Sequence, residues 1–224
     1  MIVLHHLENS RSQRVLWLLE ELGVPYEVKR YARDKTTMLA PPELRKVHPL
    51  GKSPVIVDGD ITVAESGAIL EYLVQAYGQG SGLLPAAGTP EQRRCTYWMH
   101  YAEGSAMPPL LLSLIFSRLP KGPMPFFIRP VVQGIADKVR KGFVAPQLKL
   151  HADYIESELA KHAWFAGGEF TVADIQMSFP LEAGAARGDK ASARPRTAAF
   201  LETIHARPAY QRALAAGGPY ELMR

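Results

Sequence analysis

The first eighty residues alternate between the apolar spacing of strands and that of helices. A short apolar run, Ile2-Val3-Leu4, is followed by a polar stretch over residues 7–12. Four apolar residues then occupy one face of a helix: Val15, Leu18, Leu19 and Leu22. Gly23 ends this helix, and residues 26–31 alternate as a strand does. The pattern predicts a strand–helix–strand unit, and its crossover helix makes the two strands parallel.

The next fifty residues predict a short helix, a hairpin and a longer helix. Proline is tolerated in the first helical turn, so a short irregular helix is expected over residues 42–47. Two apolar runs, 55–57 and 61–63, flank Asp58-Gly59-Asp60, whose residue types favour the tight turn of a hairpin. Glu65-Ser66 then opens a helix whose apolar face is Ile69, Leu70, Leu73, Val74 and Tyr77.

A linker-like segment divides the chain. Gly, Ser and Pro concentrate in residues 78–88, a composition typical of linkers. We therefore predict two domains, 1–80 and 89–224. After Pro90 the apolar spacing is helical throughout. Helices are expected over residues 90–118, from about 148 to 162, from 171 to about 186, and around Phe200 and Tyr210.

Four features of the second half begin or interrupt helices. Pro108-Pro109 is expected to bend or break its helix, because proline lacks the amide hydrogen that a helix interior uses. The proline-rich segment 120–130 and the polar segment 188–196 predict connections. Thr171 followed by Asp174 is a capping signature, since each side chain can bond the backbone of the other residue.

Composition and charge exclude several classes of protein. A hydrophobic fraction of 47% and a charged fraction of 21% fit a globular chain able to bury a sizeable core. The net charge of +4 comes from dispersed basic residues, so nucleic acid is not an expected partner. No apolar run approaches membrane-spanning length, and the first residues lack the features of a secretion signal. We therefore predict neither membrane insertion nor export.

Cysteine and histidine usage bears on redox chemistry and metals. The single cysteine, Cys95, precludes an intrachain disulfide, which suits a reducing, cytoplasmic compartment. Cys95 itself is expected to be a small buried residue rather than a nucleophile. The seven histidines are scattered, and His5 and His6 point to opposite faces of a strand. Because metal ligands must cluster, no metal site is predicted.

Three motifs occur in order along the chain. His48-Pro49-Leu50-Gly51-Lys52-Ser53-Pro54 is similar to the pattern Asn-Pro-x-Gly-Lys-Val-Pro. Glu65-Ser66 is similar to a Glu/Gln-Ser pair before a third helix, and residues 171–174 to a capping box in a helical domain. With these motifs the whole chain resembles a cytosolic glutathione transferase of the bacterial type, and not the Tyr or Cys variant. The resemblance implies an α/β plus all-α fold, in which a thioredoxin-like βαβ-α-ββα domain precedes a helical bundle domain.

The resemblance also implies a glutathione site built from these motifs. Pro54 would be cis and would present the backbone of Ser53 to the cysteinyl part of glutathione. Lys52 would pair the glycyl carboxylate. At the γ-glutamyl end, Glu65 would pair the ammonium and Ser66, at a helix N-terminus, would bind the carboxylate. The alternative to a binding role is a strand start, a surface lysine and an ordinary helix cap.

The group that activates the glutathione thiol is expected just before the first helix. A thiol attacks as the thiolate, and a hydrogen-bond donor at a helix N-terminus lowers the pKa of a thiol. No Tyr or Cys lies in residues 1–14, and the serine position of the family falls on Asn9, with Ser10 beside it. Ser10 is the predicted donor, and Asn9, whose amide also donates, is the alternative. Both residue types also favour a capping role.

The predicted function is glutathione transfer without a metal. The enzyme would bind glutathione, stabilise its thiolate and direct it onto a small hydrophobic electrophile or a peroxide, as in detoxification. The alternatives are a glutathione-dependent disulfide reductase or peroxidase, and a non-catalytic adaptor of the same fold. Family members usually form homodimers, so a homodimer is expected. On periodicity the candidates for the second-substrate site, although most such side chains form cores, are Tyr97, Trp98, Tyr101, Met107 and Leu110.

Overall fold

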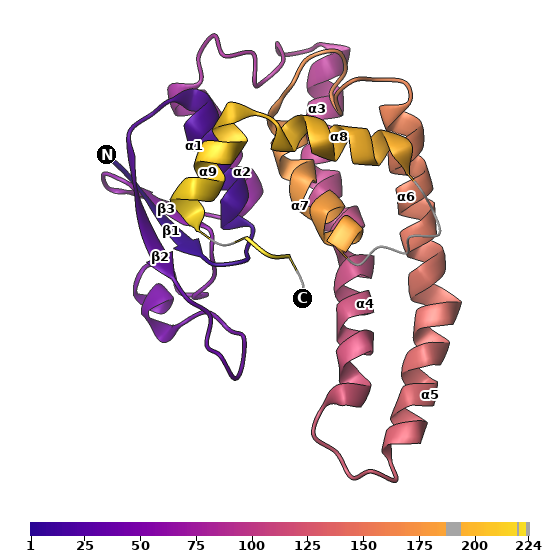
Figure 1. The fold of residues 1–224 in the computed structure, drawn as a ribbon. Helices are drawn as coiled ribbons and strands as arrows, with labels where there is room; N and C mark the ends of the chain where they lie inside the picture. The colour runs from indigo at the N-terminus through magenta and orange to yellow at the C-terminus, as the bar shows by residue number, and fades with distance from the viewer. Residues whose placement is uncertain (187–193, 219, 223–224) are drawn as a thin grey trace.

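The chain forms a four-stranded sheet with its own helices, followed by a larger group of helices (Figure 1). This computed structural model describes residues 1–186, 194–218 and 220–222. The predicted α/β plus all-α fold is confirmed. Most of the predicted polar loop, residues 188–193, lies outside the described residues. The predicted division between residues 80 and 89 stays a prediction.

The sheet has the strand order β2-β1-β3-β4. β1 (Ile2–Leu7) pairs in parallel with β2 (Tyr26–Tyr31), as the crossover helix α1 (Ser12–Leu22) predicts. β1 also pairs antiparallel with β3 (Val55–Asp58), which forms the predicted hairpin with β4 (Ile61–Ala64). The end of β1 and the start of β3 therefore lie side by side in the middle of the sheet.

The remaining helices agree with a helical second half. Among the described residues no helix is long and apolar enough to cross a membrane. In chain order they are a short 3₁₀ helix (Pro42–Lys46), α2 (Ser66–Tyr77), α3 (Pro90–Tyr101), α4 (Met107–Arg118), α5 (Arg129–Val139), α6 (Ala145–Leu159), α7 (Val172–Ala186), α8 (Pro195–His205) and α9 (Pro208–Gly217), besides one 3₁₀ and two π-helical turns.

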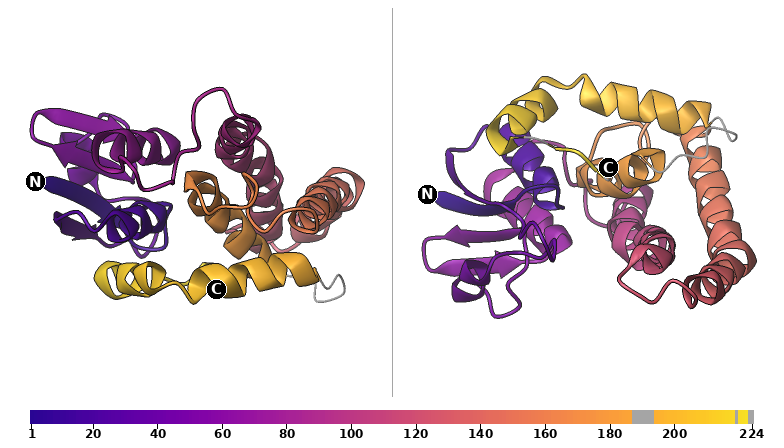
Figure 2. Two further views of the ribbon diagram at one scale, coloured as in Figure 1. Left: turned by 90° about the horizontal axis from the view of Figure 1, so that it is seen from above. Right: turned by 60° about the horizontal axis from the view of Figure 1, so that its bottom comes forward.

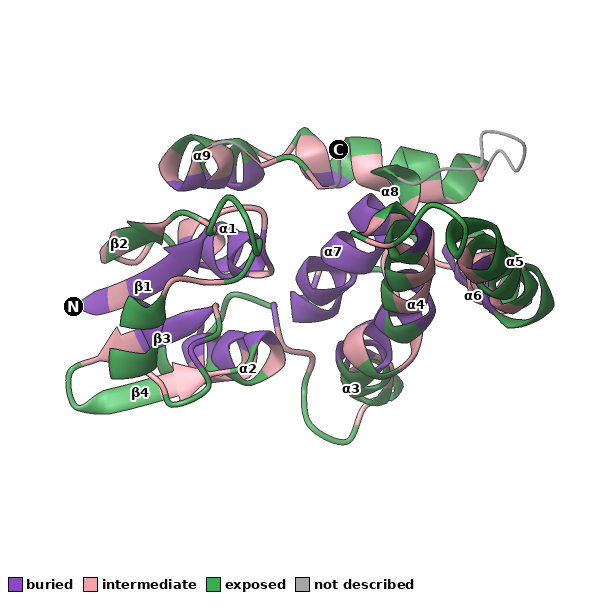
Figure 3. Cartoon of the chain, turned by 90° about the horizontal axis from the view of Figure 1, so that it is seen from below, coloured by how far each residue is buried: buried purple, intermediate pink, exposed green. Residues whose placement is uncertain are grey.

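Helix α1 is buried on more sides than its apolar stripe predicts. All residues from Ser12 to Leu19 are buried, including Arg14. One side of α1 packs on the sheet beside α2, and α7 and α9 cover the other (Figures 2 and 3). The polar side of α1 therefore faces protein instead of water, and its polar groups need protein partners.

Helix α9 brings the end of the described chain back to α1 (Figure 2). Arg207 donates two hydrogen bonds to the carboxylate of Glu21, at 2.6 and 2.9 Å. Arg212 Nε donates to Glu20 at 2.6 Å. A Cβ atom at Gly217 would lie only 2.8 Å from Leu16, so a larger residue there would collide with α1. The residues after Gly217 consequently leave α9 close to α1.

The helix predicted over residues 90–118 contains a π-helical turn, Ala102–Ala106, between α3 and α4. Pro108 and Pro109 lack amide hydrogens, so the carbonyls four residues earlier lose their usual helical partners. The amide of Met107 bonds to the carbonyl of Ala102, five residues back, which widens the helix just before the prolines. The helix break expected from Pro108-Pro109 therefore takes the form of this π turn.

A second π turn, Arg140–Val144, joins α5 to α6. It too precedes a proline, Pro146. The sequence pattern names no separate helix at α5, whose start lies inside the predicted connection 120–130, and that end of the predicted connection is wrong. Val132, Ala136 and Val139 follow helical spacing and are buried or half-buried, whereas Val131 and Ile135 are exposed. The start of α5 was missed because Pro130 predicts a connection but lies in the first turn of the helix.

Helix α7 lies at the centre of the helical half, and all its residues from 172 to 183 are buried (Figure 3). The predicted capping box begins it. Asp174 Oδ2 accepts from the amide of Thr171 at 2.8 Å, and Thr171 Oγ1 accepts from the amide of Ala173 at 3.3 Å. Asp174 Oδ1 also accepts from the amide of Phe165 at 2.8 Å. Burial raises the pKa of Asp174 to about 7, and these hydrogen bonds oppose the rise. Asp174 therefore ties α7 to the loop before it.

His6 makes the stability of the fold depend on pH. His6 is buried on β1, and its Nδ1 lies 2.8 Å from Ser12 Oγ at the start of α1. Burial and the charge of Arg30 lower the pKa of His6 from 6.5 to about 4. The unfolded chain therefore binds this proton more tightly than the folded protein. The stability that depends on a neutral His6 is complete above pH 6.5 and is lost as the pH falls toward 4.

Between pH 7 and pH 4 the free energy of unfolding of the wild type is expected to fall by about 3 kcal/mol more than that of His6→Asn. The asparagine keeps a hydrogen-bonding group near Ser12 and does not titrate. Urea unfolding followed by circular dichroism at several pH values measures the difference. His100→Asn, at an exposed histidine, is the control and should leave the pH dependence unchanged. Parallel curves for wild type and His6→Asn would contradict the expectation.

Candidate active site

The turn before β3 is fixed to the end of β1. The Ser53–Pro54 peptide bond is cis, as predicted. Ser53 Oγ donates to the carbonyl of His5 at 2.8 Å and accepts from the amide of Leu7 at 3.1 Å. Pro54 is buried, whereas Lys52 is exposed. The turn therefore holds Ser53 beside the residues that follow β1.

The start of α2 combines an unusual backbone with a buried hydroxyl. Glu65 has a φ of 73°, and a positive φ costs a residue with a side chain about 1–3 kcal/mol. Such strain persists only where the surrounding structure imposes it, and it gathers at binding sites. Glu65 is exposed, while Ser66 is buried. The predicted pair therefore offers a solvent-facing carboxylate next to an inward hydroxyl.

The hydroxyl of Ser10 is engaged within the protein. Ser10 Oγ donates to the carbonyl of Leu7 at 2.7 Å and accepts from the amide of Ser12 at 3.2 Å. It also lies 2.8 Å from Ser12 Oγ. Ser10 is buried, and its oxygen satisfies an amide at the start of α1. The Ser10 side chain consequently caps the first amide of α1, although the residue directly before the helix is Arg11.

Asn9 is more accessible than Ser10 and adopts a positive φ of 50°. Its Oδ1 accepts from the amide of Glu221, and its backbone carbonyl accepts from Arg33 Nη2 at 3.1 Å. Neither contact uses the amide hydrogens of the Asn9 side chain. Asn9 therefore keeps two donors beside the end of β1.

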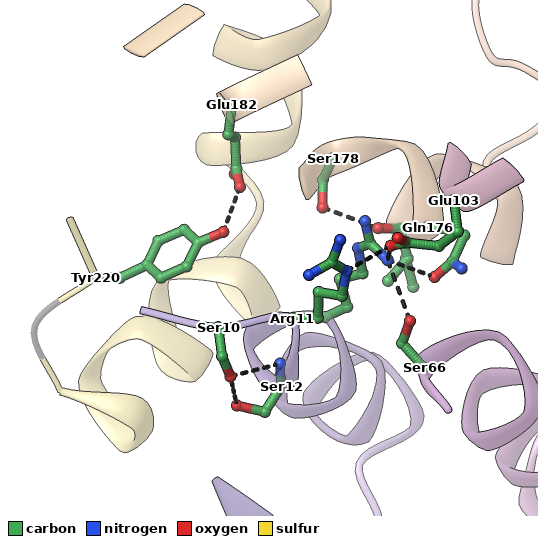
Figure 4. A network of polar contacts seen from close by, with 11 residues as sticks. Ser10, Arg11, Ser12, Ser66, Glu103, Gln176, Ser178, Glu182 and Tyr220 are labelled. Atoms are coloured by element: carbon green, nitrogen blue, oxygen red, sulfur yellow. Dashed lines mark hydrogen bonds and ion pairs between the residues drawn. The ribbon is translucent and has the colours of Figure 1, made fainter. Parts of the chain in front are cut away.

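Arg14 and Glu103 form the centre of a buried polar network, whose other members appear in Figure 4. Arg14 Nη1 donates to Glu103 Oε1 at 2.7 Å. The same nitrogen donates to Gln176 Oε1 at 2.9 Å and to Ser66 Oγ at 3.2 Å. Arg11 Nε donates to Glu103 Oε1 at 2.8 Å. Burial alone would raise the pKa of Glu103, but the two guanidinium groups hold it below its usual value. Glu103 is therefore ionised at neutral pH.

Sequence reasoning missed this network, although two signals point to it. Arg14 lies four residues before Leu18 and thus on the apolar face of α1. Glu103 lies four residues before Met107, which is itself buried. A charged residue on an apolar helix face needs a charged partner from elsewhere in the fold. Such signals identify the residues but not their partners.

The residues after α9 cover an apolar cluster beside this network. The cluster consists of Met107, Leu110, Phe179 and Ala183, and the tail, residues 220–222, packs against it through Tyr220 and Leu222. The Tyr220 hydroxyl donates to Glu182 Oε2 at 2.7 Å. A cavity of about 320 Å³ adjoins Tyr220 and Leu222. Met107 and Leu110, two of the candidates for the second-substrate site, therefore belong to the cluster that the tail covers.

The three aromatic members of that set belong to a different cluster. Trp98 stacks on Tyr154 with ring centroids 5.5 Å apart, and Tyr97 and Tyr101 lie 5.1 and 4.9 Å from Trp98. Phe165 completes the group, 4.6 Å from Trp98. Trp98 and Tyr101 are buried and join α3 to α6, the core role expected of most aromatic side chains at helical spacing, whereas Tyr97 is exposed.

The predicted site residues converge at one end of the sheet. Ser53 is bonded to the end of β1, and Asn9 and Ser10 follow that strand directly. Ser66 is tied to α1 through Arg14. Figure 4 shows the start of α1 between the tail and the start of α2. The arrangement offers a row of hydrogen-bonding groups for a small polar ligand, with an apolar cluster alongside.

Comparisons with known proteins agree with this geometry. The family model described as glutathione S-transferase, N-terminal domain, matches residues 1–75. The model described as glutathione S-transferase, C-terminal domain, matches residues 130–208. Glutathione S-transferase 3 of Schizosaccharomyces pombe is 43% identical over 195 residues, covering 87% of this chain and 78% of the relative.

Solved structures extend the similarity to the whole fold. A glutathione S-transferase from Actinobacillus pleuropneumoniae matches with a TM-score of 0.82 and 34% identity, covering 99% of this chain and 95% of that one. A glutathione transferase family member from Pseudomonas fluorescens, solved with two glutathione bound, matches with a TM-score of 0.74 and 26% identity. That match covers 95% of this chain and 92% of the other.

The chain belongs to the glutathione S-transferase family, because both family models and a relative of high identity match it. Glutathione transferase is accordingly its enzyme class, and the predicted family and activity are confirmed. The relatives come from fungi, plants and bacteria, so they confirm the family and not the narrower bacterial type.

Proposed function

We propose that glutathione lies along the end of β1, the cis turn and the start of α2, and that the enzyme directs its thiolate onto an electrophile. The observation that carries this proposal is the pair of hydrogen bonds from Ser53 to the end of β1. They bring the turn and residues 9–10 to one place, where the cysteinyl part of glutathione would meet its activating group.

Each end of glutathione then has a partner from the predicted set. Exposed Lys52 pairs the glycyl carboxylate, and the backbone of Ser53, turned by Pro54, bonds the cysteinyl part. Glu65 pairs the ammonium of the γ-glutamyl end, and Ser66 bonds its carboxylate at the start of α2. The resemblance supplies these roles, and the convergence of the residues supports them.

The contacts of Ser10 favour Asn9 as the donor to the thiolate. The Ser10 proton is donated to the carbonyl of Leu7, and Ser10 would have to break that bond to reach a ligand. The amide hydrogens of Asn9 are not used by its contacts with Glu221 and Arg33. We therefore assign thiolate stabilisation to Asn9 and the capping of α1 to Ser10.

The second substrate is a small hydrophobic electrophile or a peroxide. Its proposed contact is the apolar cluster of Met107, Leu110 and Phe179, which is buried under the tail in this structure. Cys95 is buried, and burial raises the pKa of its thiol, so it is a poor nucleophile for disulfide chemistry. Any reduction would then use the glutathione thiol itself. Among the described residues no group of three metal-binding side chains is placed to hold an ion.

A cytoplasmic homodimer is the proposed form of the enzyme. Several large apolar side chains of α4 and α5 are exposed, which favours their burial against a second copy. They include Leu111, Ile115, Val131 and Ile135. No nucleic acid or membrane partner is proposed.

Isothermal calorimetry with glutathione tests the site. We expect the wild type to bind glutathione more tightly than about 1 mM and Ser66→Ala to bind at least about tenfold more weakly, because a hydrogen bond to a carboxylate is lost. Ser117→Ala is the matched control, since the Ser117 hydroxyl bonds within the described residues only to the carbonyl of Leu114, inside α4. Wild-type binding weaker than millimolar would overturn the proposed function and favour an adaptor.

A further inference from the structure

A chain of hydrogen bonds runs from Glu103 through Arg14 to Ser66. It connects the π turn, α1 and the start of α2 in that order. Arg14 is about 1% exposed, and its Nε and Nη2 are buried without a partner among the described residues. Unpaired donors on a buried guanidinium are costly, so their retention calls for an explanation beyond packing.

The direction of the Arg14–Ser66 bond is fixed by chemistry. A guanidinium has donors and no acceptor, so Arg14 donates and Ser66 Oγ accepts. The one hydroxyl proton of Ser66 is consequently left for another acceptor. Accepting a bond from a cation also polarises the hydroxyl and makes it a stronger donor. A carboxylate at the start of α2 is the acceptor that suits such a hydroxyl.

We propose that Arg14 is a positioning residue, held by Glu103, that turns the Ser66 hydroxyl toward the γ-glutamyl carboxylate of glutathione. The inference rests on the proposed function, since it presumes that glutathione binds at Ser66. Arg14 does not touch glutathione in this arrangement. It acts by fixing which way the Ser66 proton points before the ligand arrives, which removes the cost of ordering the hydroxyl on binding.

Contacts with Gln176 and Glu103 hold the Arg14 guanidinium in place. Gln176 of α7 accepts from Arg14 Nη1 at 2.9 Å, which holds the guanidinium from the helical side. The π turn carries Glu103, whose Oε1 accepts from both Arg14 and Arg11. π turns inside α-helices recur at functional sites, and this one lies where it supplies the partner that Arg14 needs.

The test compares glutathione with cysteinylglycine, which has the same thiol and glycyl end but lacks the γ-glutamyl group. Arg14→Lys keeps the charge, but a lysine ammonium cannot hold Glu103, Gln176 and Ser66 in the same planar geometry. We expect kcat/KM for glutathione to fall at least about tenfold, mainly through KM, while that for cysteinylglycine changes less than about twofold. The preference of the enzyme for glutathione therefore shrinks.

Arg94→Lys is the matched control. Arg94 forms a similar partly buried pair with Glu158, at 3.0 Å, and also has a buried Nε without a partner among the described residues. It lies on α3 and is bonded to Glu158 and Phe165. Arg94→Lys should therefore leave the preference for glutathione unchanged. An equal loss of preference in Arg94→Lys would overturn the assignment to Arg14.

If Arg14→Lys does not fold, Glu103→Gln tests the positioning role of Arg14. The Glu103 side chain is about one-third exposed, so the neutral amide is tolerated at that position. Glu103→Gln should lower the ratio of kcat/KM for glutathione to that for cysteinylglycine. In a Ser66→Ala background, Glu103→Gln should not lower this ratio further. Unchanged preference in Glu103→Gln, or additive losses with Ser66→Ala, would overturn the role of Arg14. A wild type that does not distinguish glutathione from cysteinylglycine would instead overturn the proposed γ-glutamyl site.

Discussion

Asp174→Ala is expected to lower the free energy of unfolding by about 3–5 kcal/mol, because it leaves buried donors without an acceptor. The two carboxylate oxygens accept from the amides of Thr171 and Phe165, both at 2.8 Å, and Oδ2 also lies 3.2 Å from the Thr171 hydroxyl. Asp174 is fully buried, so water cannot replace the carboxylate. Urea unfolding monitored by tryptophan fluorescence measures the loss.

Asp153→Ala is the matched control for that measurement. Asp153 is an exposed aspartate that pairs with Lys149 and Arg194. Exposed ion pairs contribute about 0–1 kcal/mol, so this variant should remain close to the wild type. A loss below about 1 kcal/mol in Asp174→Ala would show that the capping box contributes no more than a surface pair.

Asn9→Ala is expected to reduce kcat/KM for glutathione conjugation at least about tenfold, because the thiolate loses a hydrogen-bond donor. The pKa of the bound glutathione thiol should rise at the same time. The ultraviolet absorbance of the thiolate, titrated against pH in the enzyme–glutathione complex, measures that pKa. A model aromatic halide and a hydroperoxide serve as second substrates.

Ser10→Ala separates activation from capping. Because the Ser10 hydroxyl is bonded inside the protein, this variant is expected to lose about 1 kcal/mol of stability and to keep the thiol pKa of the wild type. The reverse outcome, a raised thiol pKa in Ser10→Ala and none in Asn9→Ala, would return the activating role to the serine. If neither variant loses tenfold in turnover, the activating group lies outside residues 9–10.

Much of the sheet domain could be predicted from sequence, because local signals determine it. Apolar spacing changes from that of strands to that of helices at each element, and Asp58-Gly59-Asp60 marks the hairpin. The capping box at Thr171 was equally visible, since a cap is a contact between residues three apart. The start of α5 was not visible, because Pro130 predicts a connection whereas it lies in the first turn of the helix.

The site could be predicted only where a family motif marks it. Ser53, Pro54 and Ser66 lie in such motifs, but the partners of Arg14 come from three elements far apart in the chain. Periodicity carries no information on which distant residue meets a buried charge. The inward orientation of Ser10 was equally hidden, since it depends on the carbonyl of Leu7 at the end of β1.

The π turn at residues 102–106 makes this helix tolerant of a single-residue deletion at that one place. A π turn holds one residue more than the α-helical turn it replaces. Removing one, for instance Gly104, would give an α-helical turn, and the helix before and after it would keep nearly the same relative orientation. Trp98 would keep its core, and Met107 and Leu110 would still face the tail. A deletion in a regular α-helical stretch would instead rotate everything after it by about 100°. Relatives that align with a one-residue gap at this turn would therefore present the same helix face to their substrates.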